Sequence, residues 1–181
     1  MSQKIVNAVF DRRRAAVLLH PTSLPHSHGP GEIGTEAYHF VDFLHASGVT
    51  VWQMLPLCPT HADGSPYMGL SVLAGNPDLI SLQMLRDWGW LTTNNIDAQQ
   101  SADKRNAALC NAYAGFIELG SRKDHLAWEQ FQAQHQSWLD DYALFVSLRQ
   151  AHGGKSWVDW PTTIRDRQVA ALNKARSRLV D

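Results

Sequence analysis

The sequence has 181 residues, of which 44% are hydrophobic and 18% charged, and its formal net charge is −1 at pH 7. A chain of this length can bury the core of one ordinary domain. The balanced charge argues against a nucleic-acid partner, which favours a basic excess, and no apolar run approaches the roughly 20 residues of a membrane span.

The first two predicted elements are a strand and a long loop. Residues 15–19, AAVLL, form a short continuous apolar run that ends before Pro21, and this pattern indicates a buried strand. Residues 20–34 contain three prolines and three glycines, so they are predicted to be a loop.

A helix and a second strand follow. Residues 35–48 predict a helix, with Thr35 as its N-cap and Gly48 as its end. Residues 49–57 are apolar and rich in β-branched side chains, which indicates a second buried strand. Because a helix joins two apolar strands, the segment predicts a parallel βαβ unit. The apolar stripe of the helix is expected to consist of Tyr38, Phe40, Val41 and Leu44.

The rest of the chain is predicted to be mainly helical. Residues 78–82 resemble a short strand, and residues 83–91 predict a helical turn or two. Further helices are expected over residues 101–120, capped by Ser101, over 123–151 and over 165–181, with a linker at 94–100. The 123–151 helix is expected to bury Trp128, Phe131, Trp138, Tyr142, Phe145 and Leu148. The predicted domains are therefore residues 1–92 and residues 93–181.

Residues 58–77 form a second long loop, which carries apolar side chains between its glycines and prolines. The loops after two parallel strands leave the same edge of a sheet, and in α/β barrels that carboxyl edge holds the active site. The sequence therefore predicts a functional role for the 58–77 loop. Only two firm strands and a doubtful third are present where a barrel needs eight, so we expect the opening part of a larger fold.

Several polar side chains on these loops are candidates for chemistry. Glu32 and Asp63 are candidates for a general acid and base, but solvated loop carboxylates or turn caps are the favoured interpretation. The loop histidines match no closed zinc pattern, so no metal site is predicted. They are His20, His26, His28 and His61, and His20 is expected to be a hydrogen-bonded structural residue. Cys58 and Cys110 form neither a disulfide framework nor a zinc pattern and fit a reducing cytoplasm.

Five blocks occur in an order and spacing that resemble the N-terminal region of amylomaltase, the bacterial 4-alpha-glucanotransferase family. They are LLHPTSLP (18–25), EAYHFVDFL (36–44), VWQMLPLCPT (51–60), SPY (65–67) and AGNPDLISL (74–82), and DDYALFVSLRQAHGG and WVDWP follow. The resemblance implies an α/β fold, namely the incomplete N-terminal part of a (β/α)8 TIM barrel with an inserted helical subdomain. It also implies transfer of an α-1,4-glucan segment to glucose or a maltooligosaccharide, with no cofactor.

The resemblance further implies a retaining mechanism, in which two carboxylates about 5 Å apart act as nucleophile and as acid/base. The family's catalytic acids lie in later barrel strands, so no residue here is assigned as catalytic and the chain alone is expected to be inactive. The resemblance assigns a binding role to Tyr67, which would pack against the donor sugar, and to Ser65, which would line the same subsite. Met68 and Gly69 stand where many members carry glutamine and serine, which removes a sugar hydrogen bond.

Alternatives remain for the aromatic residues and for the whole chain. Tyr67 would otherwise pack beneath its own loop, and the seven tryptophans suit either core packing or sugar stacking. Packing is favoured for Trp52, Trp128, Trp138, Trp157 and Trp160. The cations of the last helix, Arg165, Arg167, Lys174, Arg176 and Arg178, are expected to form a solvated face. A non-catalytic glucan-binding protein, or a truncated product that does not fold stably, is the alternative to an enzyme fragment.

Overall fold

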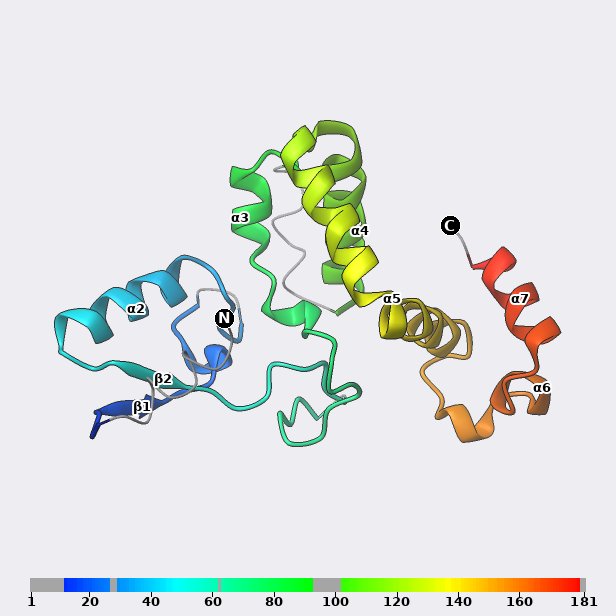
Figure 1. Ribbon diagram of the computed structural model, residues 1–181, viewed down its shortest axis with the longest axis horizontal. Coiled ribbons are helices and arrows are strands. Elements are labelled where there is room, and N and C mark those ends of the chain that lie inside the picture. Colours follow the sequence, from blue (N-terminus) through cyan, green and yellow to red (C-terminus); the bar gives the residue numbers. More distant parts are fainter. Residues whose placement is uncertain (1–11, 27–28, 62, 93–101, 180–181) are drawn as a thin grey trace. The chain divides into compact units, whose positions relative to one another are not determined.

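The computed structural model describes residues 12–26, 29–61, 63–92 and 102–179. The chain forms two compact units, Met1–Arg122 and Lys123–Asp181 (Figure 1). The predicted linker at 94–100, the cap at Ser101 and His28 lie outside the described residues. The predicted domain boundary between residues 92 and 93 stays a prediction, because residues 93–101 lie outside the described part of the chain.

The first unit begins with the predicted βαβ arrangement. Strands β1 (Ala16–Leu18) and β2 (Val51–Gln53) pair in parallel, with Val17 opposite Trp52, and helix α2 (Thr35–Ala46) joins them. Phe40 of α2 packs edge-on against Trp52, with ring centroids 4.9 Å apart. The Trp52 indole donates a hydrogen bond to the Leu19 carbonyl at 2.8 Å, so one side chain ties helix to both strands. The parallel pair is thus confirmed as the predicted frame.

The predicted burial of this frame is partly wrong. Leu18 in β1 is 57% exposed, and Tyr38 in α2 is 59% exposed, so neither packs as expected. Among the described residues the sheet has two strands, and a pair of strands offers α2 too little surface to cover a full apolar stripe. The helix also begins one residue early, with Gly34 as N-cap and Thr35 as the first helical residue. Gly48 adopts φ +71° just beyond the helix, as its predicted end requires.

Residues 78–82 do not form the predicted strand. Pro77–Leu79 is a 3-10 helix, η2, and Ile80 makes only an isolated parallel bridge to Ile33. The Asn76 side chain accepts a hydrogen bond from the Asp78 amide at 2.9 Å and caps this turn, while Pro77 supplies the φ angle that a helical start needs. Local capping therefore overrides the strand preference of the apolar side chains.

The core of the first unit lies between two helices, α3 (Leu82–Asp87) and α4 (Ala102–Leu119), which pack side by side (Figure 1). Ser81 caps α3, because its hydroxyl accepts a hydrogen bond from the Met84 amide at 3.4 Å. The buried cluster consists of Leu82, Leu85, Leu91, Ala108 and Ala112. Among the described residues, no helix is both long and apolar enough to cross a membrane.

The second unit is helical, as predicted. Helix α5 (Arg122–Ala151) ends at Gly153 and Gly154, which both have positive φ, and η4 (Trp157–Asp159) follows. Helices α6 (Thr162–Arg165) and α7 (Val169–Arg178) complete the unit. Its core consists of Leu144, Leu148, Trp160, Leu172 and Ala175, so α5 buries only part of the predicted stripe and Phe131 is 41% exposed.

The helix predicted over residues 165–181 begins later, as α7 at Val169, and the short helix α6 ends at Arg165 before it. Arg167 adopts φ +57°, which ends α6, and its guanidinium contacts the Asp141 carboxylate of α5 at 2.7 Å. A left-handed residue cannot continue an α-helix, so α6 and α7 are separate helices. The cations of α7 are exposed as expected, but Arg176 also reaches Asp141, at 3.5 Å.

A substitution in α4 tests the packing of the first unit. A Cβ at Gly115 would stand 2.1 Å from the Trp90 carbonyl oxygen. Glycine to alanine inside a helix normally stabilises by up to about 1 kcal/mol, but here the clash reverses the sign. We expect Gly115→Ala to lower the free energy of unfolding by about 1–3 kcal/mol, measured as a fall in the urea midpoint. Gly75→Ala, where no atom lies within 4 Å, is the matched control, and a higher midpoint for Gly115→Ala would contradict the packing.

Candidate functional site

The loop that follows β2 folds back on itself as a narrow hairpin. Its base is closed where the Asn76 amide donates a hydrogen bond to the Leu57 carbonyl at 2.8 Å. Higher up, the Leu70 amide donates to the Pro59 carbonyl at 2.7 Å, and Thr60 and Gly69 form an antiparallel bridge. The loop is therefore built by its own backbone hydrogen bonds and leaves the carboxyl end of a parallel strand.

The tip of this hairpin is a tight turn over Ser65, Pro66, Tyr67 and Met68. The Met68 amide donates to the Ser65 carbonyl at 3.2 Å, and Pro66 occupies the second position, where its fixed φ favours a turn. The Asp63 carboxylate accepts a hydrogen bond from the Ser65 amide at 3.2 Å and so fixes the entry to the turn. This turn places the two residues singled out from the sequence, Ser65 and Tyr67, next to each other.

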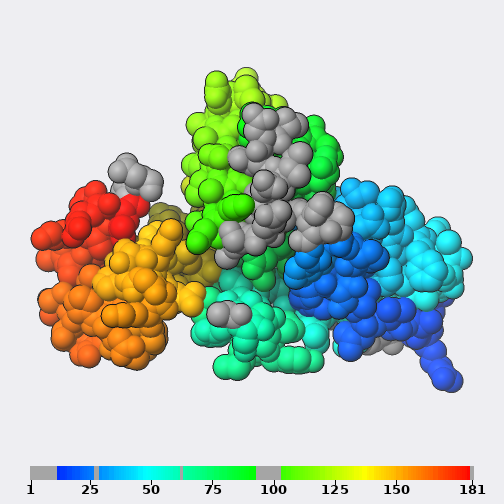
Figure 2. Space-filling model, turned by 180° about the vertical axis from the view of Figure 1, so that it is seen from behind, coloured from blue at the N-terminus to red at the C-terminus, as the bar shows by residue number. Residues whose placement is uncertain are grey.

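The turn presents its apolar side chains to solvent. Tyr67 is 76% exposed and Val72 97% exposed, and Met68 and Leu73 are exposed as well. In Figure 2 the turquoise segment forms an open surface of the first unit. The ring of Tyr67 therefore does not pack beneath its own loop, whereas Ser65 is half-buried. Contact of either residue with a sugar stays a prediction.

Gly69 packs closely against its neighbour Cys58. A Cβ at position 69 would stand 2.2 Å from the Cys58 sulfur, far closer than van der Waals contact allows. A serine at position 69, which the family resemblance would place there, would require the Cys58 side chain to rotate or the hairpin to shift. The departure from the family pattern at Gly69 therefore coincides with a thiol packed against this position.

Glu32 is not the solvated carboxylate that the sequence favours. Its side chain is 8% exposed and faces a guanidinium and an imidazole, with Oε2 3.8 Å from Arg105 Nη2 and Oε1 3.8 Å from His26 Nε2. Sequence reasoning missed Arg105 because it lies on α4, far along the chain, and no local pattern links it to Glu32. Asp63 is exposed and caps a turn, as favoured.

The remaining loop histidines show no ligand geometry. The Nδ1 atom of His20 lies 2.7 Å from the Thr22 hydroxyl, so the predicted structural role is confirmed, and His61 is exposed. Within the described ranges, no group of three histidine, cysteine or acidic side chains is placed to bind a metal.

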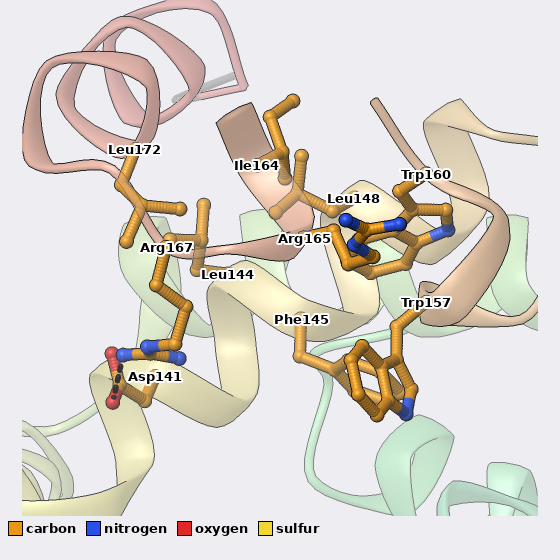
Figure 3. A pocket seen from close by; sticks show the side chains of 10 residues that line it. All are labelled: Asp141, Leu144, Phe145, Leu148, Trp157, Trp160, Ile164, Arg165, Arg167 and Leu172. Carbon is orange, nitrogen blue, oxygen red and sulfur yellow. Dashed lines mark hydrogen bonds and ion pairs between the residues drawn. The ribbon is translucent and has the colours of Figure 1, made fainter. Parts of the chain in front are cut away.

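The second unit contains a separate hollow of about 360 Å³, formed by α5, η4, α6 and the start of α7. Figure 3 shows the Arg167 side chain directed toward Asp141, with which it forms an ion pair. Trp160 is buried, as predicted, but Trp157 is 53% exposed at the wall of the hollow. Asp166 raises the pKa of Arg165 through a hydrogen bond and its negative charge. The walls are mainly apolar: Leu144, Phe145, Leu148, Trp157, Trp160, Ile164 and Leu172.

The chain resembles known proteins along almost its whole length. A family model described as 4-alpha-glucanotransferase matches residues 19–181. A 4-alpha-glucanotransferase of Thermus thermophilus is 40% identical over 93% of this chain, and a chloroplastic/amyloplastic one of Solanum tuberosum is 36% identical over 91%. A solved amylomaltase from Streptococcus agalactiae, in complex with acarbose, superposes with a TM-score of 0.81 at 32% identity and covers 93% of this chain.

The relatives are much longer than this chain. It covers 35% of the Thermus thermophilus protein, 31% of the Solanum tuberosum protein and 36% of the Streptococcus agalactiae structure. The chain therefore spans about a third of the length of the curated relatives it matches, and the predicted resemblance to an N-terminal portion is confirmed.

A double substitution tests the fit between Gly69 and Cys58. Gly69→Ala alone is expected to cost about 1–3 kcal/mol of stability, because the new methyl group displaces the sulfur or the hairpin. Cys58→Ala alone should lower the stability by less. The double variant should be about 1 kcal/mol more stable than the sum of the two single effects predicts, because the alanine at 58 leaves room for the new methyl group. Thermal unfolding of the four proteins measures this cycle, and strict additivity of the two effects would show that the positions are not in contact.

Proposed function

This chain belongs to the 4-alpha-glucanotransferase family, and from that membership we propose that it is the N-terminal portion of an enzyme that transfers α-1,4-glucan segments. The acceptor in this proposal is glucose or a maltooligosaccharide. The observation that carries the proposal is the exposed Tyr67 in a Ser-Pro-Tyr turn on the loop that leaves a parallel strand. An aromatic face held open to solvent by a rigid turn suits stacking against a sugar ring.

In this proposal the β1–α2–β2 unit is the first βαβ unit of a (β/α)8 barrel, and residues 93–181 form an inserted helical subdomain. The parallel register and the intervening helix support the first part. The loop with Tyr67 would then lie over the mouth of the barrel, where enzymes of this fold bind their substrates. The exposed side chains of β1 and α2 would be covered by later strands and helices of the barrel.

We assign Tyr67 to the donor subsite beside the scissile bond and Ser65 to its wall. The flat face of the tyrosine ring would pack on the apolar face of a glucose unit, and its hydroxyl would remain free to bond a sugar hydroxyl. The backbone amide of Ser65 is held by the Asp63 carboxylate, so the backbone from which its hydroxyl projects is fixed two residues before the ring. Together they would orient the donor sugar, and neither would take part in breaking the glycosidic bond.

The chemistry itself is proposed to be a retaining double displacement. One carboxylate attacks the anomeric carbon while a second, protonated one releases the leaving oxygen, and the two lie about 5 Å apart. We place these acids in the later barrel strands of the family. No cofactor is part of the proposal, and a cytoplasmic location stays a prediction.

Substitution of the turn tyrosine tests the binding role. Tyr67→Ala should raise the maltoheptaose dissociation constant by about tenfold or more, a loss of ~1.4 kcal/mol, because the stacking face is removed. Tyr67→Phe keeps the ring and should lose much less. Isothermal titration of the chain with maltoheptaose measures both constants.

Tyr38→Ala is the matched control, because Tyr38 is a similarly exposed tyrosine, at 59%, on α2 outside the loop. An equal loss of affinity in the Tyr38 and Tyr67 variants would contradict the assignment of the subsite to the turn.

The proposed position of the catalytic acids gives a second test. The 181 residues alone should show no disproportionation of maltotriose, measured as glucose release and longer oligosaccharides, while the polypeptide of the complete reading frame should be active. Transfer by the 181 residues would refute the placement of the acids. A longer polypeptide that binds maltoheptaose without transfer would favour a non-catalytic glucan-binding protein of the same family.

A further inference from the structure

Arg105 is a largely buried cation that contacts several backbone carbonyls of the first unit. Its side chain is 13% exposed, and its Nη2 group lies 3.4 Å from the Pro77 carbonyl and 2.8 Å from the Asp78 carbonyl, and also bonds the Ile80 carbonyl. Its Nε lies 3.6 Å from the Asp78 carboxylate. One guanidinium from α4 thus gathers the backbone oxygens of η2 and of the residue that follows it.

Glu32 supplies the opposite charge to this arrangement. Its carboxylate lies 3.8 Å from Arg105 Nη2, and the next residue, Ile33, donates its amide to the Leu79 carbonyl at 2.9 Å. A buried guanidinium without a counter-charge is costly, so Glu32 holds Arg105 in its buried, bonded position. The loop after β1 and the segment after the Tyr67 hairpin are in this way fastened to the same helix.

The fastened segment is the base of the Tyr67 hairpin. Asn76, which closes that base through the Leu57 carbonyl, also caps η2 by accepting the Asp78 amide at 2.9 Å. The backbone from Asn76 to Ile80 is therefore held from one side by the hairpin and from the other by Arg105. Displacement of η2 would open the Asn76 bond and allow the hairpin to swing about β2.

We propose that Arg105, with Glu32 as its counter-charge, is a positioning residue for the Tyr67 turn. Neither side chain needs to touch the sugar: they act through η2 and Asn76 on the angle at which the hairpin leaves the strand. The sugar-binding consequence rests on the proposed function, whereas the effect on the hairpin does not.

Hydrogen exchange and glucan binding by the full 181-residue chain test this inference together. Arg105→Met should raise the exchange rate of the Asn76 and Leu70 amides by about tenfold relative to the Ala112 amide in α4. It should also raise the maltoheptaose dissociation constant by about fivefold at a temperature where the chain is fully folded. Arg105→Lys keeps the positive charge but loses the planar, multiply donating guanidinium, so its exchange rates and dissociation constant should lie between those of the unmodified chain and of Arg105→Met. Glu32→Gln should raise both quantities by less than Arg105→Met does.

Leu91→Ala is the control for a general loss of stability, because Leu91 is buried in the α3–α4 core and makes no contact in this network. The two variants are compared at equal distance below their melting temperatures. If Leu91→Ala raises the exchange rate of the Asn76 amide as much as Arg105→Met does, the positioning role is wrong. A local rise in exchange with unchanged affinity would likewise overturn it. Absence of maltoheptaose binding by the unmodified chain would overturn the proposed function. The exchange rates of the Asn76 and Leu70 amides would then still test whether Arg105 positions the hairpin.

Discussion

A buried charge pair between Arg105 and Glu32 lies where the main segments of the first unit meet. The guanidinium donates hydrogen bonds to the carbonyl oxygens of Asp78 and Ile80, and the Glu32 carboxylate places a counter-charge 3.8 Å from Nη2. Three stretches far apart in the sequence meet at this pair: the loop after β1, the return of the Tyr67 hairpin, and α4. Together with the Ile33–Leu79 and Asn76–Leu57 hydrogen bonds, the pair connects the α3–α4 cluster to the loops that leave the two strands.

Elements with local signals were predictable, and elements decided by distant partners were not. The parallel strands, the end of α2 at Gly48 and the end of α5 at its two glycines follow from composition and turn chemistry alone. The strand predicted at residues 78–82 is wrong although a local signal was present, because Asn76 and Pro77 before it are typical of the start of a helical turn. The burial of Glu32 was beyond reach, since its partner Arg105 is brought in by tertiary packing.

The candidate site shows the same division. The Ser-Pro-Tyr turn follows from its proline and from the Asp63 side chain, and both can be read from the sequence. That Tyr67 projects into solvent required the structure, because an aromatic residue after proline is equally able to fold under its loop. The helical half was predicted in outline, but the left-handed turn at Arg167 between α6 and α7 was not, since arginine is no local signal for positive φ and its contact with Asp141 is brought in by tertiary packing.

The close approach of Gly69 to Cys58 makes these two positions one steric unit. The space for a single side chain is shared between them, and in this chain the thiol fills it. A side chain added at position 69 would need the Cys58 side chain to rotate or shrink. Alkylation of the thiol would enlarge the group between the two arms of the hairpin, so a change at Cys58 would be felt in the segment that carries the Tyr67 ring.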